Sequence, residues 1–241
     1  MKLLLGTTML AGLLIAGAAQ AADMPLKAPP RAAPYYSDWT GFYVFGFGGY
    51  SWGRISPDDF NIGSLFFDTG FHNPKPKGGV FGFGGGYLWQ YGAWVGGLEV
   101  DYGFSDEKET QTVTFSDQEI TSVSMHSKID ALGSARLRAG YLFTPNLLAY
   151  GTAGLGWGRS KLSFTECFGP TDCATLSAKP NLFGWVAGGG LEYKLFEHVR
   201  IRGEYLHYDF GSSGYSFQTN TTINFKTRDD VARGALIWSF N

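Results

Sequence analysis

The sequence predicts an all-β protein, an eight-stranded antiparallel transmembrane up-and-down β-barrel. Only 17% of the 241 residues are charged, whereas 17% are aromatic and 35 are glycine. Eight segments alternate apolar positions with polar or glycine positions, which is the period of a β-strand. Short and long connections between these segments also alternate, as they do in barrels with tight turns at one membrane surface and long loops at the other. A net charge of -2 argues against a dedicated nucleic-acid binder.

Residues 1–21 are predicted to be an export signal that is removed. A positive Lys2 precedes the apolar and small residues of 3–19, and Ala19-Gln20-Ala21 fits the small-x-small cleavage pattern. No later apolar run reaches the ~20 residues of a membrane-spanning helix. Residues 22–38 are expected to form a Pro-rich periplasmic lead, and residues 39–241 are expected to form the barrel.

The first predicted strand runs from Gly41 to Trp52, and the second runs from Gly79 to Trp89. In the first strand, Tyr43, Phe45 and Phe47 share one side, and we assign that side to the lipid. In the second strand, aromatic residues alternate with glycines in the same way. Both segments have the length that a transmembrane strand needs, ~9–11 residues.

The six later segments also have one side without charges, and the opposite sides of most of them carry charged residues. These segments are Trp94–Phe104, Ile129–Phe143, Leu147–Trp157, Phe183–Leu195, Val199–Tyr205 and Leu236–Phe240. The charge-free sides are expected to face lipid, with aromatic residues near the strand ends forming interfacial girdles. A soluble lipocalin-like barrel is the alternative, but an eight-stranded interior has too little room for so many rings.

The polar sides of these strands predict a network of charges inside the barrel. Eight-stranded barrels are just wide enough to be filled by side chains. We take Trp94 and Phe143 as matching periplasmic ends of two neighbouring strands, and Leu195 as facing Val199 across a short turn. Opposed residues then lie ~4.5–5.5 Å apart at Cβ. The expected contacts are Glu99 with Arg138, Asp101 with Arg136, and Glu192 with Arg202.

The long connections cover residues 53–77, 105–125, roughly 161–180, and 211–225. Cys167 and Cys173 lie in the third of them, where exposure to the outside favours a disulfide over free thiols. The first connection is unusually apolar, and the alternatives are an interaction site or packing against the barrel mouth. Its apolar residues are Phe60, Ile62, Leu65, Phe66, Phe67 and Phe71. The four histidines have no nucleophile suitably placed beside them, so we expect no enzyme, no metal site and no cofactor.

The export signal, the Pro-rich lead and the run Trp39-Thr40-Gly41-Phe42-Tyr43-Val44 resemble the small porin-like outer-membrane proteins of Gram-negative bacteria. These proteins are the surface-antigen, opacity-protein-like branch of the OmpA-type barrel domain. The resemblance covers essentially the whole mature chain. Members commonly end on an aromatic residue that the barrel-assembly machinery reads, whereas here Phe240 is followed by Asn241.

The resemblance implies a structural, surface-exposed barrel in the outer membrane that contributes to envelope integrity and surface contact, with no catalytic residues. Its expected partners are outer-membrane lipid, the barrel-assembly machinery, and the cell wall or a host surface. Two alternatives stay open. One is a narrow passive porin-like channel, and the other is a ligand or adhesion receptor acting through its outer loops, with haem at His72 as one ligand.

Overall fold

A computed structural model describes residues 38–57, 72–114, 122–168, 172–216 and 222–240. The predicted export signal, nearly all of the predicted lead, and the apolar residues 60–71 lie outside this part of the chain. The described residues form nine strands: β1 Gly41–Pro57, β2 Lys77–Tyr91, β3 Trp94–Thr114, β4 Ser122–Thr144, β5 Leu147–Phe168, β6 Asp172–Ala178, β7 Asn181–Lys194, β8 Val199–Ser216 and β9 Thr222–Ser239. Within these ranges there is no helix long and apolar enough to cross a membrane.

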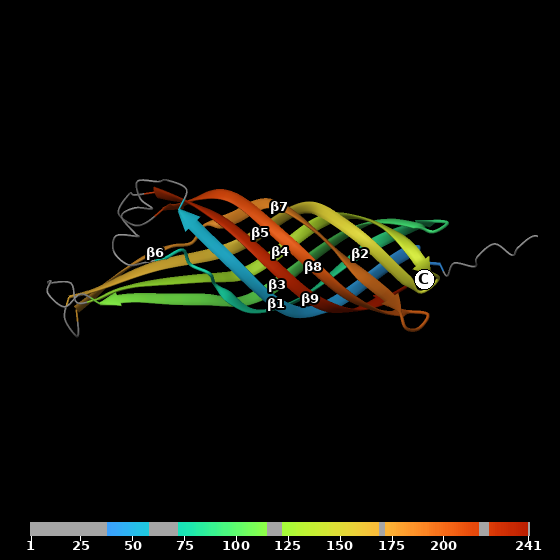
Figure 1. Cartoon of the computed structure of the whole chain (residues 1–241), viewed down its shortest axis with the longest axis horizontal. Coiled ribbons are helices and arrows are strands. Elements are labelled where there is room, and N and C mark those ends of the chain that lie inside the picture. The colour runs from blue at the N-terminus through green and yellow to red at the C-terminus, as the bar shows by residue number, and fades with distance from the viewer. Residues whose placement is uncertain (1–37, 58–71, 115–121, 169–171, 217–221, 241) are drawn as a thin grey trace, which may run out of the picture. The chain divides into compact units, whose positions relative to one another are not determined.

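Eight of the strands close into a ring, in the order β1-β2-β3-β4-β5-β7-β8-β9, and each strand is antiparallel to its neighbours (Figure 1). β9 pairs back onto β1 over fifteen residue pairs, from Tyr43 with Ser239 to Pro57 with Phe225. Closure satisfies the backbone groups that an open sheet would leave at its edges. The predicted fold class, an antiparallel up-and-down ring of eight strands, is confirmed.

β6 is the strand that the sequence did not predict. It pairs with the outer part of β5, from Leu162 with Ala178 to Phe168 with Asp172. β7 pairs with the preceding part of β5, from Arg159 with Asn181 to Leu147 with Tyr193. β6 therefore continues the line of β7, and the two are separated by Lys179 and Pro180, where proline has no N–H to donate to a ladder. The expectation of a polar loop over 161–180 is wrong for most of its length.

Strands also replace much of the other predicted loops. β3 continues ten residues past Phe104, β4 begins at Ser122, and β8 continues to Ser216. These extensions are rich in Ser and Thr, whose side chains bond across neighbouring strands, as Thr112 does with Ser124 at 2.9 Å. The barrel is consequently longer at its loop end, which we define as the end opposite the short turns at Gly92, Pro145 and 195–198 (the turn end).

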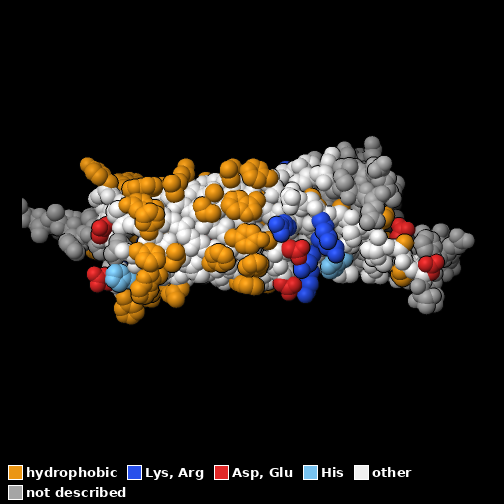
Figure 2. Space-filling view, turned by 180° about the vertical axis from the view of Figure 1, so that it is seen from behind, with side chains coloured by type: hydrophobic (Ala, Val, Ile, Leu, Met, Phe, Trp, Pro, Cys, Tyr) orange, Lys and Arg blue, Asp and Glu red, His pale blue; other side chains and the backbone are white. Residues whose placement is uncertain are grey.

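Two bands of exposed apolar side chains run across the face in Figure 2, with a band of small residues between them. Aromatic residues dominate both bands. The turn-end girdle contains Phe42, Trp89, Trp94, Tyr141, Phe143 and Trp238, and the loop-end girdle contains Tyr50, Trp52, Phe81, Phe104, Phe183, Trp185 and Tyr205. Such girdles mark the two membrane–water interfaces. In β3, the membrane-spanning segment is therefore Trp94–Phe104.

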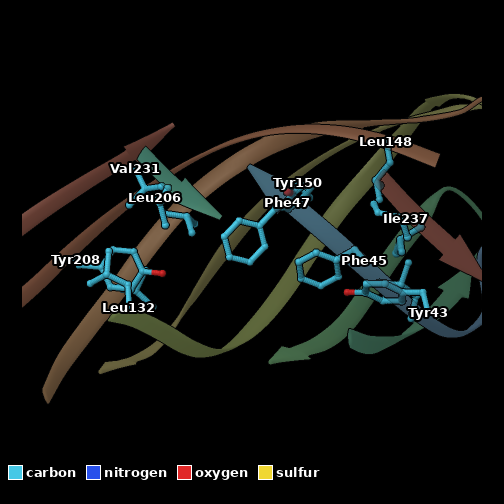
Figure 3. Close-up of a cluster of buried hydrophobic side chains, with 14 of the residues drawn as sticks. Tyr43, Phe45, Phe47, Leu132, Leu148, Tyr150, Leu206, Tyr208, Val231 and Ile237 are labelled. Atoms are coloured by element: carbon cyan, nitrogen blue, oxygen red, sulfur yellow. The ribbon is translucent and has the colours of Figure 1, made fainter. Parts of the chain in front are cut away.

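The predicted direction of the β1 side chains is wrong. Tyr43, Phe45 and Phe47 are 1%, 4% and 7% exposed and point into the lumen (Figure 3), whereas Phe42 and Val44 face outward. The inner face of neighbouring β2 supplies the space for these rings. A Cβ atom at Gly84 would lie 2.5 Å from the Phe45 ring. Glycines of β2 thus leave room for the rings of β1. The alternation within a single strand does not reveal this packing between neighbouring strands.

Candidate functional site: the charged lumen

Nine charged side chains fill the lumen at membrane depth, and we call them the charged lumen network. They come from five strands of the ring, and in each the polar side of the alternating pattern points inward. The members are Glu99, Asp101, Arg136, Arg138, Glu192, Arg200, Arg202, Glu204 and Arg233. None is more than 6% exposed. Buried charges of this number are tolerated only when they are paired and hydrogen-bonded.

Glu99 of β3 has the densest set of contacts. Its carboxylate accepts hydrogen bonds from Arg136 and from Arg138, the latter at 3.0 Å, and it lies 2.8 Å from Arg202 Nη1. The Tyr43 hydroxyl also donates to it, at 2.6 Å. Charge-assisted bonds from arginine are about twice as strong as neutral ones. Glu99 therefore links strands β1, β3, β4 and β8 across the interior.

The other three carboxylates extend the network around the ring. Asp101 accepts from Arg136 at 2.9 Å, from Arg233 at 2.8 Å and from Ser134 at 2.9 Å. Glu192 and Glu204 each lie within 4 Å of three arginines. The partners are Arg138, Arg200 and Arg202 for Glu192, and Arg136, Arg202 and Arg233 for Glu204. Every carboxylate of the network thus has at least two cationic neighbours.

Aromatic rings occupy the space that the charges leave. The guanidinium of Arg138 lies 3.8 Å from the centroid of the Tyr150 ring, and that of Arg233 lies 4.1 Å from the Phe47 ring. The Tyr150 hydroxyl donates to Glu204 at 3.0 Å. Guanidinium groups stack favourably on aromatic faces, most strongly when water is excluded. The lumen at this level is a packed interior of rings and ion pairs.

The structure brings the six predicted lumen residues together. Arg138 contacts Glu99, Arg136 contacts Asp101, and Arg202 contacts Glu192 at 3.1 Å. The predicted strand register is correct between β7 and β8, where Glu192 faces Arg202. Between β3 and β4 it is wrong by two residues.

In that pair of strands, Trp94 faces Tyr141 rather than Phe143, and Glu99 faces Arg136. The physical reason is that no tight turn joins β3 and β4 at the turn end. Their register there is set by packing, as the T-shaped contact of Trp94 with Tyr141 shows, with 5.2 Å between ring centroids. The long arginine side chains reach the acids diagonally in spite of the shift.

Three members of the network, Arg200, Glu204 and Arg233, were not predicted from the sequence. All three stand on polar sides of the alternating pattern, and that signal alone could have found them. Their partners were not predictable in the same way, because Arg233 on β9 reaches Asp101 on β3, and these strands are not neighbours in the ring.

A second group of acids lies closer to the loop end, and we call Glu107 and Asp229 the acid pair. They are 0% and 1% exposed. Ser105 donates to Glu107 and Ser51 donates to Asp229, both at 2.7 Å. Within the described ranges, no Lys, Arg or His nitrogen lies within 4 Å of either carboxyl, and Oε2 of Glu107 accepts no hydrogen bond.

Glu107 lies three residues beyond Phe104 and so outside the membrane-spanning segment of β3. Burial raises the pKa of its carboxyl to about 7, and the hydrogen bond from Ser105 offsets only part of this effect. Toward the loop end an apolar cluster covers the interior. It consists of Ile55, Met125, Leu162, Ala178 and Phe225.

Cys167 and Cys173 face each other in the β5–β6 pair and form a disulfide with an S–S distance of 2.09 Å. His126 and His207 bond to Thr110 and Asp230, and neither is near these cysteines in the strand pairing. The described part of the chain contains no group of three or more His, Cys, Asp or Glu residues placed to hold a metal ion.

Comparison with known proteins agrees with this architecture. Residues 8–228 match a family model described as outer membrane protein beta-barrel domain. The chain is 29% identical over 233 residues to the 31 kDa outer-membrane immunogenic protein of Brucella melitensis, covering 94% of this chain and 95% of that protein. It is 31% identical over 199 residues to the 22 kDa outer membrane protein of Rhizobium leguminosarum bv. viciae, covering 81% and 74%.

Among solved structures, the chain is similar in fold to a neisserial surface protein, Neisserial surface protein A. The identity is 15%, the TM-score is 0.42, and the match covers 83% of this chain and 98% of that one. The names of the two sequence relatives describe outer-membrane proteins.

Proposed function

The chain belongs to the outer membrane protein beta-barrel domain family and lies in the outer membrane of a Gram-negative bacterium; on this premise we propose that it is a structural, surface-exposed barrel whose lumen is closed to ions. The observation that supports the proposal is the charged lumen network. Five arginines and four carboxylates, with rings packed between them, occupy the interior at membrane depth.

Closure follows from the energetics of these contacts. A passing ion must separate buried ion pairs, and the separated charges lie in an interior of low dielectric where each unpaired charge costs several kcal/mol. The network also links non-neighbouring strands, so a single rotamer change opens no continuous path. Because a barrel closed in this way conducts no ions, we assign it roles in envelope integrity and surface display.

Conductance in planar bilayers tests the proposal. Wild-type protein is expected to show no steady current. Arg136→Ala combined with Arg138→Ala removes cations from all four network carboxylates and is expected to produce ion conductance. The matched control is Arg159→Ala combined with Lys226→Ala, which removes two cations from outside the lumen. Steady wild-type conductance that the lumen variant leaves unchanged would replace the proposal with a narrow porin-like channel.

Surface contact is the second part of the proposal, and the strand extensions support it. β3 and β4 continue well past the loop-end girdle, and the apolar cluster around Leu162 gives this extension its own core. Two relatives are named as immunogenic or surface proteins. Deletion of residues 60–71 should lower adherence of the protein to immobilised host matrix. The same deletion should leave barrel assembly intact, because we expect assembly to depend on Phe240. Equal adherence would remove this role.

A further inference from the structure

The outward face of the barrel carries lysines that are directly opposed across three consecutive strand pairs. Lys77 faces Lys108, Lys108 faces Lys128, and Lys128 faces Lys161. On the other side of β1, Arg54 faces Arg228 of β9. Like charges directly opposite each other destabilise a sheet. A row of opposed cations along several strands is therefore stabilised when negatively charged groups lie beside it.

The protein's own acids neutralise only some of these cations. Asp209 pairs with Arg228 at 2.9 Å, Asp106 with Lys108 at 3.4 Å, and Asp130 with Lys128 at 2.7 Å. Among the described residues, no acidic side chain lies within 4 Å of the charged nitrogens of Arg54, Lys77 and Lys161. The same holds for Nζ of Lys75, which precedes β2 and whose backbone N–H donates to Glu109. We call the whole set the basic belt: Arg54, Lys75, Lys77, Lys108, Lys128, Lys161 and Arg228.

The height of the basic belt on the barrel identifies its surroundings. Lys77 faces Trp52 of the loop-end girdle, and Lys108 is four residues beyond Phe104. At ~3.3 Å per residue along a tilted strand, the belt begins within about 10 Å of the girdle. Figure 2 shows Lys and Arg side chains gathered directly beyond the apolar band on the loop-end side. This is the depth of lipid headgroups, outside the hydrocarbon.

A cleft in the belt adds a defined binding place. It has a volume of about 190 Å³, and its lining residues are Trp52, Gly53, Arg54, Lys75, Lys77, His207, Arg228 and Asp230. Four of these side chains are permanent cations. The only carboxylate among them, Asp230, already accepts bonds from Tyr205 at 2.6 Å and from His207 at 2.7 Å. Among the described residues, the cleft therefore presents more positive than negative charge to a ligand of phosphate size.

We propose that the basic belt binds phosphate groups of lipid headgroups in the outer leaflet, and that the cleft beside Trp52 holds one such phosphate. Arginine binds phosphate through two parallel hydrogen bonds, and lysine binds it as a point charge. The lipid fixes phosphates at the height of the belt, so several contacts form together. This inference rests on the position of the belt outside the girdle and is independent of whether the lumen conducts ions.

Lipid binding to the purified barrel in zwitterionic detergent tests the proposal. The probes are bisphosphorylated lipid A, the same lipid without its phosphates, and inorganic phosphate, and native mass spectrometry measures the bound lipid. The wild-type protein should bind the bisphosphorylated lipid at least tenfold more tightly than the dephosphorylated one. Arg54→Gln combined with Lys77→Gln should remove most of this preference, and added NaCl should weaken it.

Two controls test whether binding depends on the cations of the basic belt or on the total positive charge of the protein. Lys194→Gln removes a cation at the turn end of β7, far from the belt, and should leave binding unchanged, whereas Arg54→Lys keeps the charge and should retain most of it. Faster migration of unboiled than of boiled protein on a denaturing gel checks folding, and Lys128→Gln replaces the double variant if that variant does not fold. Equal binding of the two lipids, an unaffected double variant, or complete competition by millimolar inorganic phosphate would overturn the proposal.

Discussion

Two levels of one lumen treat buried charge in opposite ways. At membrane depth, each carboxylate of the charged lumen network lies within 4 Å of two or three arginines. A few residues closer to the loop end, the acid pair has serine hydroxyls as partners, and no cation from the described ranges lies within 4 Å of it. The difference teaches that the first level is held by ion pairing, whereas the second is more stable when it keeps a proton.

Arg202→Met should have the largest effect, because it breaks the network while keeping its volume. Arg202 lies 2.8 Å from Glu99 and 3.1 Å from Glu192, and its side chain is fully buried. Removing one partner of a buried ion pair leaves the other uncompensated, so the free energy of unfolding should fall by about 3–5 kcal/mol. Urea unfolding in detergent micelles measures this change.

The double variant Arg202→Met with Glu192→Gln sharpens the comparison. It removes one charge of each sign, so we expect it to be more stable than Arg202→Met alone. If both variants lose the same free energy, the loss comes from packing around Arg202 and not from unpaired charge.

The sequence predicted the ring of eight strands and the inward direction of the six lumen residues because alternation along a strand is a local property. Their pairing depended on an assumed register, which was wrong by two residues between β3 and β4. It assigned Glu99 and Arg136 to the interior without any knowledge of the register. It did not predict contacts across the ring, such as Arg233 with Asp101, because these depend on closure of the barrel.

The direction of the β1 side chains was missed for a related reason. A strand that alternates rings and glycines has no charge to mark its inner side. A tyrosine such as Tyr43, with an apolar ring and a polar hydroxyl, fits either the lipid side or the lumen side. Only the glycines of β2 decide that the rings point inward. The acid pair was missed because Glu107 stands in a segment whose polarity indicated a loop.

Gly84→Ala should have the next largest effect at the level of the network. A Cβ atom there would lie 2.5 Å from the Phe45 ring and 2.6 Å from the Val100 carbonyl oxygen, and that backbone atom cannot turn aside. Overpacking of this kind costs about 1–3 kcal/mol. Gly48→Ala is the control, because a Cβ atom at Gly48 meets nothing within 4 Å. Equal unfolding free energies for the two variants would show that the rings adapt freely.

Glu107→Gln should act in the opposite direction to the network variant. The pKa of Glu107 is raised from 4.5 to about 7, so the folded state holds a proton that the unfolded chain releases between these values. The free energy of unfolding of the wild type should therefore fall as the pH rises from about 4.5 to about 7. Glu107→Gln should reduce this slope, while Asp229 of the acid pair keeps its own contribution. The variant should be about 1–3 kcal/mol more stable than the wild type at pH 8.

Unfolding curves at several pH values measure the slope. Asp106→Asn is the matched control, because this exposed acid on the same strand pairs with Lys108. It should leave the slope between pH 4.5 and 7 as in the wild type. A Glu107→Gln variant with an unchanged slope would show that Glu107 does not hold the proton and that the contrast between the two levels is wrong.

Replacing both Cys167 and Cys173 by serine should have the smallest effect on the barrel. The disulfide joins cysteines only six positions apart in the sequence, and it lies at the far end of the β5–β6 pair, beyond both levels of the lumen. The loop-closure entropy of so short a connection is about 2 kcal/mol, and it acts on the hairpin and not on the ring. The free energy of unfolding of the barrel should therefore change by less than about 1 kcal/mol, while amide exchange in β6 speeds up at least tenfold because the hairpin opens locally. Hydrogen exchange followed by mass spectrometry separates the two regions. A loss of several kcal/mol for the whole barrel would mean that the loop-end extension and the charged lumen network unfold as one unit, so that the ion pairs at membrane depth depend on a bond at the surface.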